Sequence, residues 1–224
     1  MQPSHVIRAD FDRLAPISDD AWSHNSHYHA FLLRHLPPHC DESLDIGCGT
    51  GAFARLLAQR STRVLALDLS PEMIRVAQAR STGFPNVNYQ VADVLDWPFP
   101  AERFDCVASI ATFHHLPMAA MFAAVRTALK PGGVLLILDL YKSQGWGERL
   151  DAGLAMSASL ALRWLHNGRI REPEAARQAW AAHGEHDLYP RLSEVRDICS
   201  AALPGAIVKR HLLWRYSLVW RKPR

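Results

Sequence analysis

Residues 44–57 read LDIGCGTGAFARLL, which combines a short apolar strand, an acid within it, a turn rich in glycine and the start of a helix. Glycines at positions 47, 49 and 51 let the backbone turn sharply and leave no Cβ in the way of a ligand. The free N–H groups at the start of the helix point back at this turn, which suits a flat or charged group. The spacing is G-x-G-x-G, whereas dinucleotide-binding enzymes carry G-x-G-x-x-G. We therefore expect a ligand seat at residues 47–51 that is not a dinucleotide site.

Strand and helix patterns alternate on both sides of the glycine turn. Strands are predicted at residues 43–46, 64–68, 86–91, 104–110 and 134–139, and helices at 50–59, from 70 onward and at 118–129. The run VLLILD at 134–139 is apolar throughout its first five positions, as in a strand buried on both faces. The alternation with short connections predicts βαβ units and a parallel sheet.

The pattern changes after Tyr141. Three helices are predicted at residues 145–166, 173–183 and 193–203, followed by two strands at 206–213 and 215–221 with a tight turn between them. Ligands of open α/β sheets bind beyond the carboxyl ends of the strands, so an insertion leaving the fifth strand can fold over that site as a lid. At the other end of the chain, residues up to about 18 show little pattern, and a helix is predicted at 26–36.

Composition excludes several classes of protein. The chain has 224 residues and a formal charge of +3, which gives no whole-chain electrostatic case for a nucleic-acid or membrane partner. Its four cysteines form no C-x-x-C pair, as expected for reduced thiols in the cytoplasm. The polar start of the chain does not resemble a signal peptide, and the most apolar stretch, 154–165, is too short to span a bilayer. We expect a soluble cytoplasmic protein.

Two acids lie at the ends of the second and third predicted strands. Asp68 follows Gly47 by about twenty residues, the distance at which an acid on the second strand reaches a ribose held at the glycine turn. Asp93 is placed to accept a hydrogen bond from a purine amine, with Leu69, Met73 and Val94 as apolar walls. Taken singly, either acid could be a helix cap or a loop residue. Their joint arrangement with the glycine turn favours an adenosine site.

The successive motifs of the chain resemble those of class I S-adenosylmethionine-dependent methyltransferases. They read LDIGCGTG from 44, ALDLSPEMIRVA from 66, VADVLDWPF from 91, FDCVASIATFHHLP from 104 and LKPGGVLLILDL from 129. The closing AIVKRHLLWRYSLVW, from 206, is similar to the last two strands of that family. The resemblance implies a Rossmann-like α/β fold. Its seven-stranded sheet would be mostly parallel, with an antiparallel last strand, helices on both faces and a helical lid between strands five and six.

The resemblance also implies the cofactor, S-adenosyl-L-methionine, with S-adenosyl-L-homocysteine as product, and the residues that hold it. Asp45 and the turn from Gly47 to Gly51 would hold the methionine part, Asp68 the ribose and Asp93 the adenine. Tyr28 or His27, in the helix before the sheet, would approach the carboxylate or the sulfonium. The full set of expected cofactor contacts is Tyr28, Asp45, Gly47, Cys48, Gly49, Gly51, Asp68, Leu69, Met73, Ala92, Asp93, Val94 and Ser109.

On this basis we expect one methyltransferase domain with four parts. Residues 1–40 would form an N-terminal helical cap and residues 41–140 the cofactor-binding core. Residues 141–204 would form the helical lid and substrate region, and residues 205–224 the closing β-hairpin.

Candidates for proton transfer are histidines and one acid. His114 and His115 follow the fourth strand, and the lid contains His183, His186, Asp187 and Tyr189. An imidazole oriented by Asp187 could act on an acceptor that must lose a proton, although a polar loop at a helix end is the plainer alternative. We take His186, His183, Asp187 and His114 as the catalytic candidates. The His-x-x-His-Asp pattern also offers ligand types suited to Zn²⁺, but no further ligand has convincing spacing, and no metal is expected.

These features predict a methyltransferase that acts on a small organic acceptor and exists as a monomer or homodimer. Alternatives are a methyltransferase that acts on RNA or protein, a non-catalytic module that binds S-adenosylmethionine, and a nicotinamide-dependent oxidoreductase, which the glycine spacing disfavours. The basic and aromatic C-terminus invites an RNA-binding interpretation. Over 215–221, however, Tyr216, Leu218 and Trp220 alternate with Arg215, Ser217, Val219 and Arg221, which is typical of a strand with one apolar face.

Overall fold

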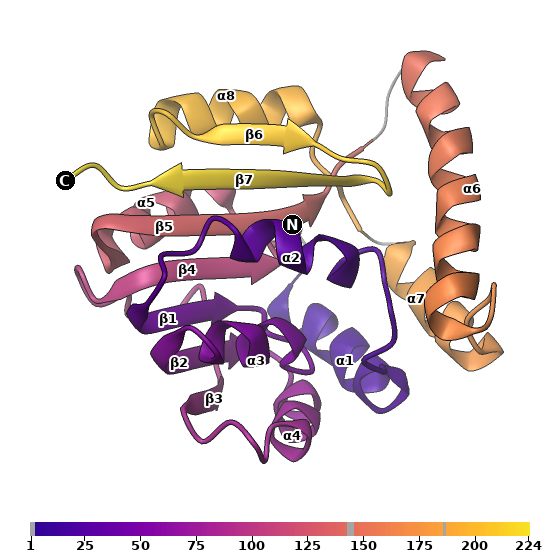
Figure 1. Ribbon diagram of the computed structural model, residues 1–224, viewed down its shortest axis with the longest axis horizontal. Helices are drawn as coiled ribbons and strands as arrows, with labels where there is room; N and C mark the ends of the chain where they lie inside the picture. Colours follow the sequence, from indigo (N-terminus) through magenta and orange to yellow (C-terminus); the bar gives the residue numbers. More distant parts are fainter. Residues whose placement is uncertain (1–2, 143–145, 186) are drawn as a thin grey trace.

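A single seven-stranded sheet forms the centre of the molecule in the computed structural model, which describes residues 3–142, 146–185 and 187–224. The strands lie in the order β3-β2-β1-β4-β5-β7-β6 (Figure 1). Their bounds are β1 Cys40–Ile46, β2 Ser61–Asp68, β3 Val87–Val91, β4 Phe104–Ile110, β5 Leu129–Leu140, β6 Ile207–Arg210 and β7 Arg215–Arg221. The predicted fold class is confirmed.

Strand pairing is parallel from β3 to β5 and antiparallel on both sides of β7. Asp45 pairs with Ala66 of β2 and with Ala108 of β4. β7 runs against β5, with Ile137 opposite Leu218, and also against β6. The short connection between β6 and β7 can form a hairpin but cannot carry a crossover, so these two strands must be antiparallel. The carboxyl ends of the first five strands consequently meet at one edge of the sheet.

Helices cover both faces of the sheet, each with its own apolar cluster. On one face, α2 (His29–Leu33), α3 (Ala52–Ala58) and α4 (Pro71–Arg80) contribute Leu32, Leu57 and Ile74. On the other face, α5 (Met118–Ala128) and α8 (Leu192–Ala202) contribute Phe122 and Val195, both almost fully buried. Short 3₁₀ turns η1 (Ala15–Ile17), η2 (Ser26–Tyr28) and η3 (Phe113–His115) complete the connections.

Two helices of the predicted insertion lie beyond the carboxyl ends of the strands. α6 (Trp146–Asn167) and α7 (Glu174–Gly184) stand at that edge of the sheet in Figure 1. α8 differs from them, because it packs against α5 and buries Val195 and Cys199 in the core, beside the buried Leu203 that follows it. Of the three helices expected to form a lid, α6 and α7 therefore lie beyond the carboxyl ends of the strands, whereas α8 packs on one face of the sheet.

The first helix of the chain was not expected from the sequence. α1 (Ser4–Leu14) packs against α4 and α7 and buries Ile7 and Leu14. The expectation of an unpatterned lead-in was wrong, because Ile7, Phe11 and Leu14 do recur at helical spacing among polar residues. This places an N-terminal helix next to the predicted ligand site.

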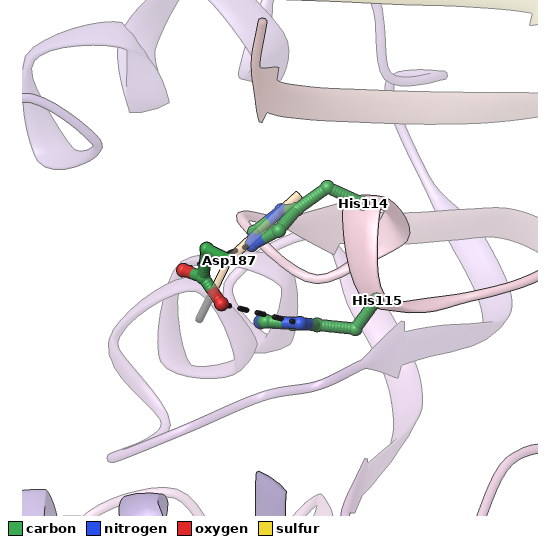
Figure 2. A group of neighbouring side chains, drawn as sticks. All are labelled: His114, His115 and Asp187. Atoms are coloured by element: carbon green, nitrogen blue, oxygen red, sulfur yellow. Dashed lines mark ion pairs between the residues drawn. The ribbon is translucent and has the colours of Figure 1, made fainter. Parts of the chain in front are cut away.

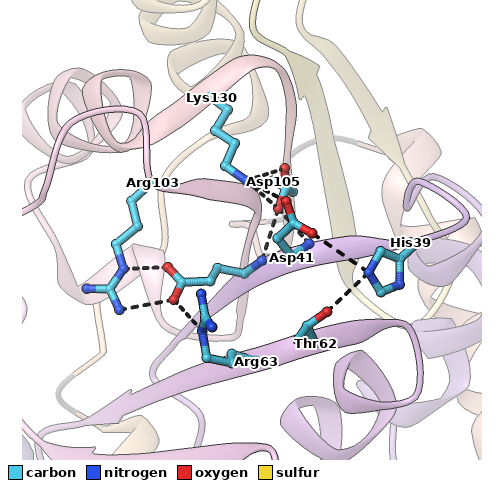
Figure 3. Close-up of polar contacts among 8 residues, drawn as sticks. His39, Asp41, Thr62, Arg63, Arg103, Asp105 and Lys130 are labelled. Carbon is cyan, nitrogen blue, oxygen red and sulfur yellow. Dashed lines mark hydrogen bonds and ion pairs between the residues drawn. The ribbon is translucent and has the colours of Figure 1, made fainter.

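Charged side chains gather at the opposite, amino edge of the sheet (Figure 3). Glu42 accepts hydrogen bonds from Arg63 at 2.7 Å and from Arg103 at 2.5 Å. Lys130 binds Asp105 at 2.9 Å. Pairs as exposed as these contribute at most about 1 kcal/mol each to stability. They link neighbouring strands at the end of the sheet away from the site.

The described part of the chain contains no helix that combines the length and the apolar character needed to cross a bilayer.

Candidate functional site

The glycine turn adopts backbone angles that favour glycine at all three positions. Gly47, Gly49 and Gly51 have φ angles of +69°, +52° and +79°. A Cβ on Gly47 would lie 2.1 Å from Thr112 Oγ1, and one on Gly51 would lie 2.4 Å from the Tyr89 hydroxyl. A Cβ on Gly49 would meet nothing within 4 Å. The first and third glycines are thus required by packing, whereas the second leaves its open side to a ligand.

Asp68 ties the glycine turn to the end of β2. Its Oδ2 accepts a hydrogen bond from the Gly49 N–H at 2.8 Å, and its Oδ1 accepts one from the Ser70 N–H at 2.9 Å. Burial raises the pKa of Asp68 to about 6, against the lowering effect of these two bonds. A carboxylate can accept about four hydrogen bonds, so capacity for two hydroxyl donors is left.

A second acid lies beneath the same turn. Asp45 is 1% exposed, and its Oδ2 has no hydrogen-bond partner among the described residues. Burial and then the neighbouring charge of Asp68 raise the pKa of Asp45 to about 7. Within the part of the chain that the structure describes, neither Asp45 nor Asp68 forms an ion pair, and this favours a positively charged or hydrogen-donating ligand at this turn.

The expected adenine side of the site is formed by the loop after β3. The Ala92 N–H donates to the Asp68 carbonyl at 2.9 Å, which fixes the loop against β2. Asp93 Oδ1 accepts the Leu95 N–H at 3.0 Å, so this carboxylate also orders its own loop. Ala92 and Val94 are half-buried against the core. Leu69 is partly exposed, and Met73 is buried beneath Leu14 and Ala15 of the N-terminal segment.

Three of the expected cofactor contacts have their polar atoms near backbone carbonyls. The Tyr28 hydroxyl donates to the Leu212 carbonyl at 2.5 Å, and burial raises the pKa of Tyr28 to about 12. The Ser109 hydroxyl donates to the Ile46 carbonyl at 2.8 Å and is fully buried within the sheet. Cys48 is a buried free thiol whose Sγ lies 3.8 Å from the Gly49 carbonyl. The hydroxyls of Tyr28 and Ser109 are thus bonded within the fold, and contact of these residues with a cofactor stays a prediction.

The catalytic candidates after β4 and after α7 come together at one point, shown in part in Figure 2. His114 Nε2 lies 3.8 Å from Asp187 Oδ2, and His183 Nε2 lies 3.4 Å from the same oxygen. His115 joins them, with Nδ1 at 3.7 Å from Asp187 Oδ1. Tyr189 donates its hydroxyl to Asp187 Oδ2 at 2.9 Å. The remaining candidate, His186, lies outside the described residues.

Two further carboxylates hold two of these imidazoles from behind. Asp139, at the end of β5, accepts His114 Nδ1–H at 2.6 Å and the His114 backbone N–H at 2.8 Å. Asp10, on α1, accepts His183 Nδ1–H at 3.2 Å. Burial alone would lower the pKa of His114, but the charges of Asp139 and Asp187 outweigh it and raise the pKa to about 9. Burial and the neighbouring His114 lower the pKa of His115 to about 4.

Sequence reasoning missed Asp139, Asp10 and Thr112. Asp139 carries the signal that identified Asp68, an acid at the end of an apolar strand, and could have been found in that way. Asp10 was missed because residues 4–14 were not expected to form a helix, although Ile7, Phe11 and Leu14 recur at helical spacing. Thr112 has no distinctive pattern, and its role follows from its position against Gly47.

The amino-acid sequence is similar to those of known methyltransferases. Residues 44–133 match a family described as a methyltransferase domain. An uncharacterized methyltransferase of Mycobacterium bovis is 30% identical over 216 residues, covering 92% of this chain and 99% of that protein. The chain belongs to the class I S-adenosylmethionine-dependent methyltransferases.

Other relatives of this methyltransferase extend the comparison. A ubiquinone biosynthesis O-methyltransferase of Xanthomonas axonopodis is 27% identical over 79% of this chain and 80% of its own length. The N-methyltransferase NodS of Bradyrhizobium japonicum, solved in complex with S-adenosyl-L-homocysteine, superposes with a TM-score of 0.64. That alignment has 21% identity and covers 97% of this chain and 98% of NodS, which supports the fold.

Proposed function

We propose that this methyltransferase binds S-adenosylmethionine at the glycine turn and transfers its methyl group to a small organic acceptor. The observation that carries the proposal is the open side of Gly49 above the two buried carboxyl groups of Asp45 and Asp68. NodS, whose fold this chain shares, was solved with the product of that cofactor. When bound, S-adenosylmethionine supplies a methyl group on a sulfonium, which is already activated for displacement.

The residues at the carboxyl edge fit this cofactor. Asp68 has spare acceptor capacity for two ribose hydroxyls, and the unpartnered oxygen of Asp45 suits the cationic end of the methionine part. Asp93 Oδ2 is available to an exocyclic amine, since Oδ1 holds the loop. These three acids thus offer partners for the ribose, the adenine and the charged methionine part of the cofactor.

Methyl transfer to a ready nucleophile requires mainly alignment and the exclusion of water. α6 and α7 stand over the carboxyl edge and can enclose a small acceptor there (Figure 1). The ubiquinone-pathway relative is named for a small-molecule route, which supports the same class of acceptor. The roles of His114, His183, His186 and Asp187 in proton transfer stay predictions, because a base is needed only where the acceptor must lose a proton.

The test combines calorimetry with product identification. The purified chain is expected to bind S-adenosylmethionine in calorimetry and, with a labelled donor and a metabolite extract, to give a labelled small product. The Asp68→Ala variant serves as the matched negative control. Label that appears only in RNA or protein would overturn the small-acceptor proposal, and a chain that does not bind the cofactor would overturn the whole assignment.

A further inference from the structure

The strongest feature whose role the proposed function leaves open is the cluster of imidazoles at the C-terminal end of α7. The side chains of His114, His115, His183 and Asp187 are 3%, 8%, 6% and 3% exposed. They come from η3, from the last turn of α7 and from the loop after it. Buried polar side chains nearly always have hydrogen-bond partners, so a group of three imidazoles and a carboxylate with long mutual distances calls for an explanation.

We propose that His114, His115, His183 and Asp187 form a binding site for a divalent zinc-class metal ion that fastens the helical insertion to the sheet. The inference rests on side-chain geometry and does not require the proposed function. Sequence reasoning rejected a metal at His183-x-x-His186-Asp187 for want of further ligands. The fold supplies those ligands from residues about seventy positions earlier in the chain.

Spacing within the cluster is that of co-ligands. Ligand atoms of His114, His115 and Asp187 all lie within 4.8 Å of one another. The three imidazole nitrogens stand 3.4 to 3.8 Å from Asp187 oxygens, beyond the usual length of an N–H···O bond, about 2.7–3.2 Å. Two ligands bound to one tetrahedral ion at about 2.0–2.2 Å lie about 3.3–3.6 Å apart. The three nitrogen–oxygen distances lie within a few tenths of an ångström of that range. Other ligand atoms of the group, up to 4.8 Å apart, would draw closer together on binding the ion.

Carboxylates behind the imidazoles orient them as in metal proteins. Asp139 binds Nδ1 of His114 and Asp10 binds Nδ1 of His183, so that Nε2 of each ring faces Asp187. Metal-ligating histidines almost always donate their other N–H to a carboxylate, a carbonyl or water. Two such pairs that converge on one acid form the outer layer of a metal site.

One unpartnered atom faces the cluster. Asp187 Oδ1 is buried and has no hydrogen-bond partner among the described residues. His115 Nε2 is unpartnered as well, but it points away from the side of the ring on which Nδ1 faces Asp187 and is not a ligand of the same ion. Leaving a buried carboxylate oxygen without a donor costs about 1–3 kcal/mol. A cation held between Asp187 Oδ1 and His115 Nδ1, which are 3.7 Å apart, would satisfy that oxygen.

The donor set selects the metal. Imidazole nitrogen suits Zn²⁺ and its late first-row neighbours, whereas Mg²⁺ and Ca²⁺ prefer oxygen ligands only. Four protein ligands without an open position are typical of a structural zinc site. The ion would join η3, α7 and, through Asp10, α1. Bound in this way, the ion would hold α7 over the carboxyl edge of the sheet. One of its ligands, His114, lies two residues after Thr112, which contacts Gly47 of the glycine turn.

The experiment measures metal binding directly. A tag-free chain, stripped with a chelator, is titrated with Zn²⁺ in calorimetry and in competition with a chromophoric chelator. One Zn²⁺ per chain is expected to bind and to raise the melting temperature. Asp187→Asn and His115→Gln are expected to weaken binding at least tenfold, and Asp139→Asn by about 10–100-fold. His211→Gln, at a partly buried imidazole outside the cluster, is the matched control and keeps the wild-type affinity.

Spectroscopy of the metal-loaded wild-type chain tests the proposal without the variants, in case these fail to fold. Co²⁺ is expected to give the intense visible absorption of a tetrahedral site, and X-ray absorption of the Zn²⁺ form to show imidazole ligands without sulfur. A stripped wild-type chain that takes up no Zn²⁺, or Zn²⁺ affinity unchanged in both Asp187→Asn and His115→Gln, overturns the proposal. S-adenosylmethionine calorimetry on the same samples separates the two assignments, because cofactor binding without Zn²⁺ would remove only this inference.

Discussion

Individual residues at the glycine turn divide between packing and binding. Gly47 and Gly51 face Thr112 and Tyr89, whereas Gly49 faces open space and binds Asp68 through its N–H. The same G-x-G-x-G motif therefore contains positions with different physical requirements, and substitution can separate them.

Gly51→Ala is expected mainly to lower stability, and Gly49→Ala mainly to weaken cofactor binding. The first places a Cβ 2.4 Å from the Tyr89 hydroxyl at a φ of +79°, so it should lower the free energy of unfolding by about 2–3 kcal/mol. The second adds only the left-handed strain, about 1 kcal/mol, but blocks the ligand side. Urea unfolding and cofactor calorimetry on both variants test this. Equal loss of stability in the two would contradict the packing role of Gly51.

Asp68→Ala is expected to weaken S-adenosylmethionine binding by about 10–100-fold, since hydrogen bonds to a charged group contribute about 1.5–3 kcal/mol. Asp197→Ala, an exposed acid on α8, is the control. Calorimetry at constant pH gives both affinities. Asp68→Ala with wild-type affinity would remove this acid from the site.

Asp45 should make the stability of the ligand-free protein depend on pH. Burial raises its folded pKa to about 7, whereas a free aspartate titrates near about 3.9. A raised pKa stabilises the fold fully below the unfolded pKa, and this contribution is lost as the pH rises through about 7. The melting temperature of the wild type is therefore expected to fall more steeply between about pH 5 and pH 8 than that of Asp45→Asn. Parallel curves from scanning calorimetry would contradict a protonated Asp45.

Among the elements, α6 is held to the N-terminal segment by specific contacts. The Trp22 N–H donates to Asn167 Oδ1 at 2.9 Å, and Asn167 Nδ2 donates to the Trp22 carbonyl at 2.9 Å. His24 Nε2 lies 2.7 Å from the Ser159 hydroxyl. The segment before the sheet is thus joined to the middle and the C-terminal end of α6, although the two lie more than one hundred residues apart in the chain.

Asn167→Ala is expected to loosen α6 without unfolding the sheet. Both hydrogen bonds to Trp22 are lost, each contributing about 1 kcal/mol, while the two core clusters are untouched. If α6 opens locally, about 2 kcal/mol corresponds to a factor of about 30, so limited proteolysis should cleave the insertion about 10–30-fold faster, with little change in the melting temperature. Gln178→Ala, which removes a contact within α7, serves as the control. Cleavage at the wild-type rate would show that the Trp22 contacts do not hold α6.

For the whole molecule, the basic C-terminus closes the sheet. Arg221 donates to the His35 carbonyl at 2.8 Å, and Lys222 donates to the Leu129 carbonyl at 2.7 Å. Tyr216, Leu218 and Trp220 of the same strand are buried. These contacts support the structural interpretation of the terminus over RNA binding.

Lys222→Ala is accordingly expected to lower the free energy of unfolding by about 1 kcal/mol and to leave retention on an RNA column unchanged. Arg224→Ala, at an exposed position, is the control, because it removes one positive charge as Lys222→Ala does but is expected to leave stability unchanged. Retention that is strong in the wild type and falls in both variants would instead favour a nucleic-acid acceptor.

The sequence by itself determined the sheet and predicted where a cofactor would bind. Strand periodicity, the glycine spacing and the acids at strand ends are local signals, because a parallel βαβ unit places consecutive strand ends at one edge. The proposed contacts Asp45, Gly49, Asp68 and Asp93 were predicted in this way. The position of α8 in the core and the helical character of residues 4–14 were within reach of the same pattern but were missed.

Only the tertiary structure decided the imidazole cluster. His114 and His183 are separated by about seventy residues, and Asp10 by more than one hundred from either. No spacing in the sequence encodes how far α7 folds back over β4, since that depends on packing between the insertion, α1 and the sheet. The sequence showed the histidines and the acid, and the fold brought them within reach of a single ion.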